Sequence, residues 1–174
     1  MMRSMRLAAL ACCCMAALPA RADITAADLQ VAARALTFVE NPLSGTVRVG
    51  IVYAADKPRS VQQAEALRDL LGNGLRAGRL NLRPVMVESK SVAAANVDLF
   101  FLTEQIGASS AQIANASVTR QVPCVTTDIE QVRNGACILG VRSRPKVEIL
   151  VNRAAAAASG VTFATLFRVM ITEL

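Results

Sequence analysis

The stretch Val97–Leu102, with the sequence Val-Asp-Leu-Phe-Phe-Leu, decides the fold class, because it is the strongest signal for a buried β-strand in the chain. A short apolar run bounded by polar segments is typical of a strand that is covered on both faces. Such strands occur mainly in parallel sheets whose two faces are packed with helices. We therefore expect strands and helices to alternate along the rest of the sequence.

Five further segments have the composition of strands. Apolar and β-branched residues fill the segments 47–53, 80–87, 122–126, 136–141 and 147–151. Pro84 lies inside the second of these segments and favours a position at the edge of the sheet, because proline has no backbone N–H to donate. The polar turn Arg142–Lys146 separates the last two segments closely enough for a β-hairpin.

Apolar residues at helical spacing predict helices between these strands. A capping-box variant at Thr25–Asp28 starts a helix over residues 26–39, and Asn41-Pro42 follows it. Ser60 is predicted to cap a second helix, which Gly72 and Gly74 stop. The remaining predicted helices are a short one from Ser109 or Ser110 to Ala116, an alanine-rich turn from Asn152 to Gly160, and a terminal helix over Phe163–Leu174 with one strongly apolar face.

This order of elements predicts an α/β fold. We expect a mostly parallel sheet with helices on both faces, an antiparallel C-terminal hairpin and a terminal helix. The sequence contains no internal repeat, linker or low-complexity tract, so residues 23–174 are predicted to form a single domain. The apolar face of the terminal helix could serve as a partner surface, although packing into the core is the simpler interpretation.

Residues 1–22 have the pattern of a cleaved secretory signal peptide. Arg3 and Arg6 precede an apolar run from Leu7 to Leu18, and Ala20-Arg21-Ala22 supplies small residues at the expected cleavage positions. We therefore predict export to the periplasm and a mature chain that starts near Asp23. Lipidation of Cys12 or Cys13 is the alternative. No apolar run reaches the roughly 20 residues of a transmembrane helix, so the mature protein is not expected to span the membrane.

The charge of the mature chain argues against a nucleic-acid-binding protein. The full sequence carries a formal net charge of +6, but Arg3, Arg6 and Arg21 belong to the leader, which contains no acidic residue. The remaining basic residues are scattered, and aromatic residues make up 3% of the sequence. Neither a stripe that follows phosphates nor an aromatic stacking platform is therefore expected.

Two cysteines remain in the mature chain, Cys124 and Cys137. Because exported proteins face an oxidising compartment, we predict a disulfide between them. The alternative is two separately buried thiols. The chain contains no histidine, so we predict no transition-metal site and no cofactor.

Several stretches of the sequence, among them Leu36–Pro42, Val97–Leu102 and Val147–Ala155, resemble the YfiR family of small periplasmic proteins. The resemblance covers nearly the whole mature chain and is most specific at its end, where a strand leads into an Asn-Arg-Ala-Ala helix start, then a Gly and an apolar terminal segment. Members often carry more cysteines, and the usual Trp-Pro after the first helix is Asn41-Pro42 here. The segments that carry the resemblance are 36–42, 47–51, 97–102, 122–128, 135–138 and 147–155.

This resemblance implies a regulatory role. YfiR-like proteins hold an inner-membrane diguanylate cyclase in check through its periplasmic domain, so the expected partner is an inner-membrane sensor protein of this kind. The expected effect is lower cyclic di-GMP signalling and less biofilm formation. The sequence leaves open whether the protein also forms a homodimer.

Catalysis is not predicted. No histidine is present for a Ser-His-Asp or Cys-His site, and neither a P-loop nor a nucleophile elbow occurs. Gly72-x-Gly74 follows a predicted helix, so it does not fit a dinucleotide-binding fingerprint. Hydrolysis of an acyl or sugar bond by carboxylates alone is the remaining enzymatic hypothesis.

A small-ligand site is the second functional hypothesis. Ligands of parallel α/β sheets bind beyond the carboxyl ends of the strands. Polar side chains there could bind a small polar or cationic ligand, as in a single-lobe periplasmic solute-binding protein, although ordinary turn and cap roles explain the same residues. The candidate ligand-binding residues are Asp56, Glu104, Thr127 and Asp128.

Overall fold

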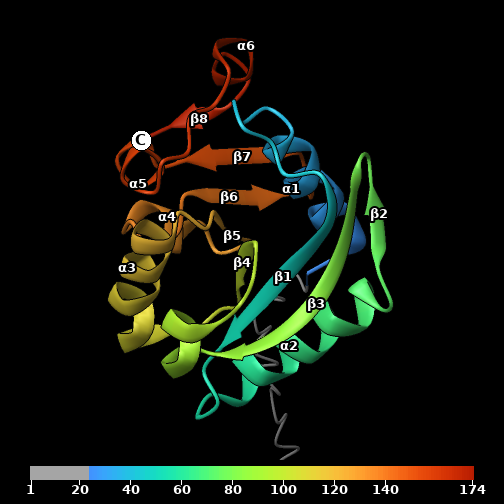
Figure 1. Ribbon diagram of the computed structural model, residues 1–174, viewed down its shortest axis with the longest axis vertical. Helices are drawn as coiled ribbons and strands as arrows, with labels where there is room; N and C mark the ends of the chain where they lie inside the picture. Colours follow the sequence, from blue (N-terminus) through green and yellow to red (C-terminus); the bar gives the residue numbers. More distant parts are fainter. Residues whose placement is uncertain (1–23) are drawn as a thin grey trace, which may run out of the picture.

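The computed structural model describes residues 24–174 (Figure 1). The predicted signal peptide, the lipidation alternative at Cys12 or Cys13 and the predicted first mature residue Asp23 lie outside this range. The described residues form an α/β structure with a single twisted sheet of eight strands. This architecture confirms the fold class predicted from the sequence.

The sheet has the strand order β2-β3-β1-β4-β5-β6-β7-β8. Strands β1, β3, β4, β5 and β6 are parallel, β2 and β7 run antiparallel to their neighbours β3 and β6, and β8 is parallel to β7. Figure 1 shows the twist, since β1 and β3 run diagonally while β6 and β7 run across the molecule. The strands are β1 (Gly45–Tyr53), β2 (Leu75–Ala77), β3 (Leu80–Glu88), β4 (Leu99–Leu102), β5 (Cys124–Thr126), β6 (Leu139–Arg142), β7 (Glu148–Val151) and β8 (Thr172–Glu173).

Helices cover both faces of this sheet. Helices α1 and α2 pack on one face, and α3, α4 and the 3₁₀ turn η1 pack on the other. The central strand β4 divides its side chains between the two sides, because successive residues of a strand point in opposite directions. Phe101 lies in the core with Leu67 of α2, whereas Phe100 lies in the core with Ile113 of α3. The helices are α1 (Ala26–Leu36), α2 (Pro58–Leu71), η1 (Ser89–Ala94), η2 (Gly107–Ser109), α3 (Ser110–Arg120), α4 (Ile129–Arg133), α5 (Arg153–Ala158) and α6 (Thr165–Arg168).

The one charge in the stretch Val97–Leu102 lies just before β4. Asp98 accepts two hydrogen bonds from the guanidinium of Arg48 in β1, at 2.7 and 3.0 Å, and a third from the Arg48 backbone at 2.9 Å. These bonds hold the pKa of Asp98 below its ordinary value, although partial burial opposes them. The pair fixes β4 beside β1 at the end where the two strands begin.

The first two helices begin or end differently from the sequence prediction. The capping box at Thr25 forms as expected, but α1 ends at Leu36 and not at Val39. The chain turns away there because Glu40 donates its backbone N–H to Thr162. Helix α2 begins at Pro58, so Ser60 lies inside the helix, fully buried, and does not cap it.

The position of Pro84 agrees with the sequence prediction only in part. Strand β3 is second in the sheet, because the short strand β2 lies outside it. However, β2 pairs only with Leu80–Leu82. Beyond Leu82, β3 therefore has a partner strand on one side alone among the described residues, and Pro84 lies in this part.

The predicted terminal helix over Phe163–Leu174 is wrong in its extent. Only Thr165–Arg168 is helical, and Thr172–Glu173 forms β8 beside β7. The apolar spacing suggested a longer helix, but Phe163 and Phe167 are buried because they contact the residues that follow α1. The ring of Phe167 stacks on Phe38 with centroids 4.8 Å apart, and Phe163 forms a β-bridge with Val39.

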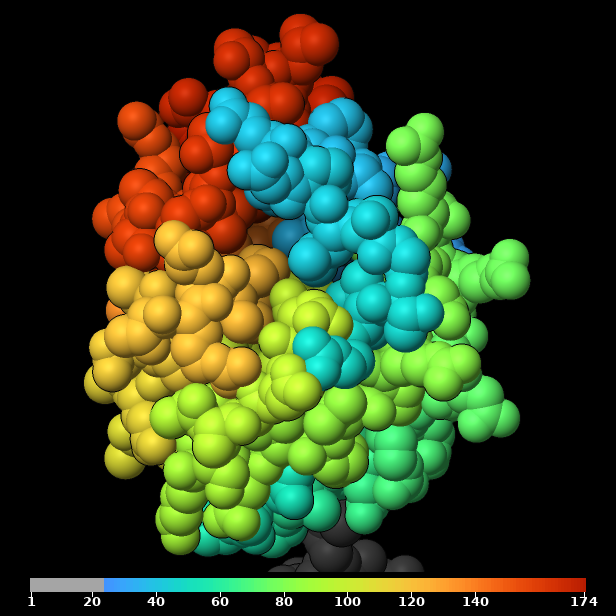
Figure 2. Space-filling view, viewed as in Figure 1, coloured from blue at the N-terminus to red at the C-terminus, as the bar shows by residue number. Residues whose placement is uncertain are grey.

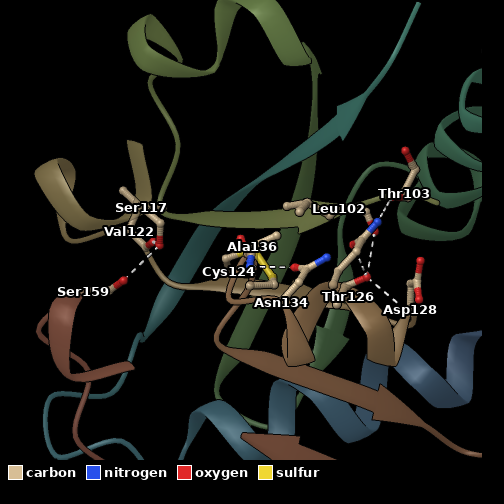
Figure 3. The surroundings of a disulfide bond; sticks show 12 residues. Leu102, Thr103, Ser117, Val122, Cys124, Thr126, Asp128, Asn134, Ala136 and Ser159 are labelled. Atoms are coloured by element: carbon tan, nitrogen blue, oxygen red, sulfur yellow. Dashed lines mark hydrogen bonds between the residues drawn. A yellow bond between two sulfur atoms is a disulfide. The ribbon is translucent and has the colours of Figure 1, made fainter. Parts of the chain in front are cut away.

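A disulfide joins Cys124 in β5 to Cys137, which precedes β6, as the sequence predicts (Figure 3). Both cysteines are buried, at 0% and 1% exposure. The bond lies in the core that α3 and α4 cover. It therefore links two neighbouring parallel strands at the ends where they begin.

Candidate functional site

A cleft of about 570 Å³ opens beyond the carboxyl ends of β4, β5 and β6. This is the edge of the sheet where the sequence predicts ligand binding. The ends of these strands form three sides of the cleft, and the start of α1 forms the fourth. The cleft is lined by Ile24, Thr25 and Asp28 of the α1 start, Glu104 and Gln105 after β4, Thr127, Asp128 and Glu130 after β5, and Arg142, Ser143 and Arg144 at the end of β6.

Three of the four candidate residues lie in this cleft. Glu104, Thr127 and Asp128 line it together, whereas Asp56 does not. Asp56 follows β1 and is exposed, with its carboxylate 3.2 Å from the Lys57 ammonium. A hydrogen bond from Lys57 holds the pKa of Asp56 below its ordinary value. Ligand binding by the four residues stays a prediction, and the cleft can involve only three of them directly.

Glu104 is held in place by α2. Its backbone N–H donates to Gln63 Oε1 at 2.7 Å, and its carboxylate accepts from Arg59 Nε at 3.1 Å. The Glu104 side chain is 17% exposed. Because Arg59 already balances its charge, this carboxylate is a weaker acceptor for a cation than its place in the cleft suggests.

Asp128, which lines the cleft after β5, has a structural role. Its side chain accepts from the backbone N–H of Glu130 at 3.1 Å and so caps the start of α4. Its own backbone N–H donates to Thr126 Oγ1 at 3.0 Å. Figure 3 shows this contact between Thr126 and Asp128. This geometry agrees with cap and turn roles, which are the simpler interpretation of these residues in the sequence.

A buried chain of hydroxyl and amide groups lies beneath the cleft. Thr126 Oγ1 donates to Gln131 Oε1 at 2.7 Å, and Gln131 Nε2 donates to the backbone oxygen of Thr103 at 2.8 Å. The Thr103 hydroxyl donates to the backbone oxygen of Val52 at 3.0 Å and lies 2.6 Å from the Ser60 hydroxyl. This chain joins β1, β4 and β5 to α2 and α4 without reaching the surface.

Asp28 binds the α1 start to the loop after β6. Its carboxylate accepts from the backbone N–H of Thr25 at 2.8 Å, from the Thr25 hydroxyl at 2.7 Å and from the backbone N–H of Ser143 at 2.7 Å. Burial alone would raise the pKa of Asp28, but these hydrogen bonds outweigh it and lower the pKa below its ordinary value.

Sequence reasoning missed Asp28, Arg142, Ser143 and Arg144 as cleft residues. The capping box identified Asp28 as part of a helix start, but nothing in the pattern places that helix start beside the ends of distant strands. Arg142 donates from Nε to the backbone oxygen of Thr127 at 3.3 Å. The lining thus combines arginine with carboxylates and hydroxyls, which suits a small polar ligand.

Neither a cluster of metal ligands nor a membrane-spanning helix is found among residues 24–174. Within residues 24–174, no three Cys, Asp or Glu side chains gather closely enough to hold a metal ion. In the same range no helix combines the length and the apolar character that crossing a bilayer requires.

A known protein family matches almost all of the described residues. The YfiR/HmsC-like family matches residues 25–167. This chain belongs to the YfiR/HmsC-like family. The match runs from the capping box of α1 to the stacked ring of Phe167, so it confirms the resemblance inferred from the sequence. Members of this family are periplasmic regulatory proteins. No curated protein matches the chain.

Two solved structures share the fold of this YfiR/HmsC-like protein. The ABC domain in complex with L-Trp from Streptococcus pneumonia superposes with a TM-score of 0.57 at 11% identity, over 84% of this chain and 60% of that one. A conserved domain protein from Vibrio cholerae superposes with a TM-score of 0.54 at 15% identity, over 87% of this chain and 60% of that one. At these identities the likeness shows the fold alone. The present chain spans about 60% of the length of each.

Proposed function

We propose that the protein is a non-catalytic periplasmic regulator that restrains an inner-membrane diguanylate cyclase by protein contact and so lowers cyclic di-GMP signalling. The observation that carries this proposal is family membership over residues 25–167. The apolar N-terminal segment supports export, because it has the charge and cleavage pattern of a secretory signal.

The carboxylates of the cleft support a non-catalytic role. General acid–base catalysis needs a group that is free to exchange a proton with a substrate. Asp28 accepts three hydrogen bonds from Thr25 and Ser143, Glu104 is paired with Arg59, and Asp128 caps α4. These three serve the fold, and Glu130, the fourth carboxylate of the cleft, is paired with Arg133 at 2.6 Å. The chain has no histidine to replace them.

An exposed apolar tip at α6 supports regulation by contact. Leu166, Val169 and Met170 are 79%, 80% and 65% exposed, although the sequence pattern places Leu166 and Met170 on the apolar face of a helix. Large apolar side chains that gather on a surface are typical of protein-interaction sites. This tip, formed by α6 and the residues just after it, is the surface we assign to the partner.

Deletion of the gene tests the regulatory role. Because loss of an inhibitor releases its target, the deletion strain should contain more cyclic di-GMP and form more biofilm. Phe100→Asp should reproduce the deletion, because an unpaired charge in the fully buried centre of β4 unfolds the protein. Unchanged cyclic di-GMP in a deletion strain whose parent expresses the protein contradicts the proposal.

Substitution of the exposed tip tests the contact. Val169→Asp should abolish repression while the melting temperature stays near that of the wild type, because the side chain is mostly in solvent. Val118→Asp in α3 is the matched control, because Val118 is also apolar and partly exposed, at 38%. If the two variants repress equally, the tip is not part of the interface.

Export is tested by mass spectrometry of the processed protein. We expect a chain that begins at Asp23 and carries no lipid. A mass that includes a diacylglycerol group on Cys12 or Cys13 would contradict this start and would place the protein on a membrane anchor.

A single-lobe solute-binding protein is the second candidate. The observation that favours it is the cleft beyond β4, β5 and β6, with Glu104 and Asp128 facing a space that Arg142 also lines. The structural neighbour bound to L-Trp gives a first ligand class to test. Calorimetry with single amino acids should show binding that Asp128→Asn weakens, since asparagine keeps the cap of α4 and removes only the charge. If none of the amino acids binds, amino acids are excluded as the ligand class.

A further inference from the structure

A second hollow, away from the cleft, runs along the outer side of α1. Its volume is about 840 Å³. One wall is the β2–β3 hairpin, which turns through Gly78 and Arg79, and the other includes the loop before β1 and Val147 at the start of β7. In Figure 2 the tip of this hairpin stands out from the body beside the loop before β1, with a notch between them. We call this hollow the α1 groove.

The floor of the α1 groove follows one stripe of α1. Ala27, Gln30, Val31, Arg34 and Thr37 line it, at the spacing that places side chains on one helix face. The stripe covers most of the helix, about 15 Å at the rise of an α-helix. The groove is therefore long and open, and its shape fits a chain segment better than a compact small molecule.

All the charge of the α1 groove is positive. Arg34 comes from the helix that forms the floor, and Arg76 and Arg79 come from the hairpin that forms one wall. No aspartate or glutamate lines the groove in the described part of the chain. Within residues 24–174, no carboxylate forms an ion pair with any of these three arginines, and all three are exposed.

Apolar side chains also line the α1 groove. Val31 and Leu43 are only partly buried against the core, and Val147 is 60% exposed. Arginines around a partly apolar floor are complementary to a segment that carries carboxylates and a few apolar anchors.

We propose that the α1 groove is a docking site for an acidic segment of a partner protein, with apolar side chains of that segment seated on Val31, Leu43 and Val147. The proposal rests on the proposed regulatory function, because that function requires a protein partner. It adds a second contact surface, distinct from the exposed tip at α6.

Charge also argues against two other occupants. The segment before Ile24 contains three arginines and one acidic residue, so it is repelled by the groove. A single small anion needs its donors to converge on one point. Here Arg34 lies on the floor and Arg76 and Arg79 lie on one wall, which matches carboxylates spread along a chain.

Selection from a displayed library of random twelve-residue peptides tests the proposal with purified protein. The wild type should enrich peptides that combine Asp or Glu with apolar residues. A synthetic copy of an enriched peptide should bind the triple variant Arg34→Glu, Arg76→Glu, Arg79→Glu about tenfold more weakly or worse, because like charges then face each other. Binding to the wild type should also weaken as salt is added.

A second triple variant controls for net charge. Arg68→Glu, Arg83→Glu, Arg133→Glu changes the charge equally at exposed positions outside the groove, and it should bind the peptide like the wild type. Circular dichroism and melting temperature should be similar for both variants, since none of the six side chains is buried. The selection does not depend on cyclic di-GMP, so a failure of the regulatory proposal in the deletion strain is recognised separately.

Three results would overturn the docking site. Enrichment of neutral or basic peptides, or equal enrichment on the groove variant, shows that the arginines do not select acidic segments. Binding to phosphatidylglycerol vesicles that only the groove variant loses, without peptide enrichment, assigns the surface to a membrane. A wild type that dimerises and a groove variant that is monomeric assign it to a second copy of the chain.

Discussion

The carboxylate of Asp28 accepts a hydrogen bond from the backbone N–H of Ser143 at 2.7 Å, across 115 positions of sequence. Asp28 belongs to the first turn of α1, and Ser143 to the loop after β6. Ser143 lines both the cleft at the strand ends and the α1 groove. One buried carboxylate therefore holds the segment that separates the two hollows.

Asp28→Asn should destabilise the protein by about 1.5–3 kcal/mol, because charged acceptors make the stronger hydrogen bonds and the new amide cannot satisfy every donor. Asp28 is 6% exposed, so water cannot replace the lost bonds fully. Urea unfolding measures the difference. Asp69→Asn is the control, since the Asp69 side chain is 69% exposed and should change stability little. Equal effects of the two substitutions would contradict the structural role of Asp28.

The stability contributed by Asp28 should depend on pH in the acidic range. Its pKa is lowered in the folded protein, so the unfolded chain takes up the proton first as the pH falls. The contribution is complete above the ordinary aspartate pKa of about 3.9 and is lost as the pH falls through the lower folded value. The difference in unfolding free energy between wild type and Asp28→Asn should shrink from pH 6 to pH 3. A constant difference would contradict the lowered pKa.

Replacing both Cys124 and Cys137 with alanine should lower the free energy of unfolding by about 2–4 kcal/mol under oxidising conditions, because the disulfide restricts the unfolded chain. Both sulfur atoms lie in the buried core, so alanine fits without exposing a polar group. Urea unfolding with and without dithiothreitol provides the check. The wild type should lose stability on reduction and the double variant should not respond.

Gly140→Ala should cost about 1–3 kcal/mol, because β6 has no room for another methyl group. An added Cβ would lie 2.8 Å from Val132 Cγ2 and 2.9 Å from Ile129 Cδ1, both in α4. Val132→Ala should relieve part of this cost when the two substitutions are combined. Strictly additive losses in thermal unfolding would show that the contact with Val132 is not the cause.

Sequence patterns predicted the elements whose formation depends mainly on residues within the element itself. The run Leu99–Leu102 forms the buried strand β4, and Asn152 caps α5 by accepting from Ala155. The terminal segment could not be predicted in the same way, because Phe163 and Phe167 are apolar for contacts with the region after α1, and β8 exists only through pairing with β7. Short elements such as β2 and α4 were missed because they contain too few residues to show a period.

The candidate site was likewise predictable in part, where a residue's place at the end of a strand determines its position. Parallel strand ends bring Glu104, Thr127 and Asp128 together, and the rule for parallel sheets predicts this from the sequence. Asp56 follows the same rule at the end of β1, yet its loop carries it away from the cleft to pair with Lys57. Asp28 and Ser143 could not be predicted, because their contact depends on the path of α1 across the sheet, which no local pattern specifies.

The buried hydroxyl chain beneath the cleft also limits which strand arrangements the protein can adopt. Strands β1, β4 and β5 are so similar in apolar character that hydrophobic burial alone would tolerate several registers. In the observed register the Thr103 hydroxyl reaches the backbone oxygen of Val52, and Gln131 bridges Thr103 and Thr126. A slip of one residue would bury these polar groups without partners, at a cost of about 1–3 kcal/mol each. The network thus favours the observed register, because misaligned sheets that the apolar core would accept leave buried polar groups unpaired.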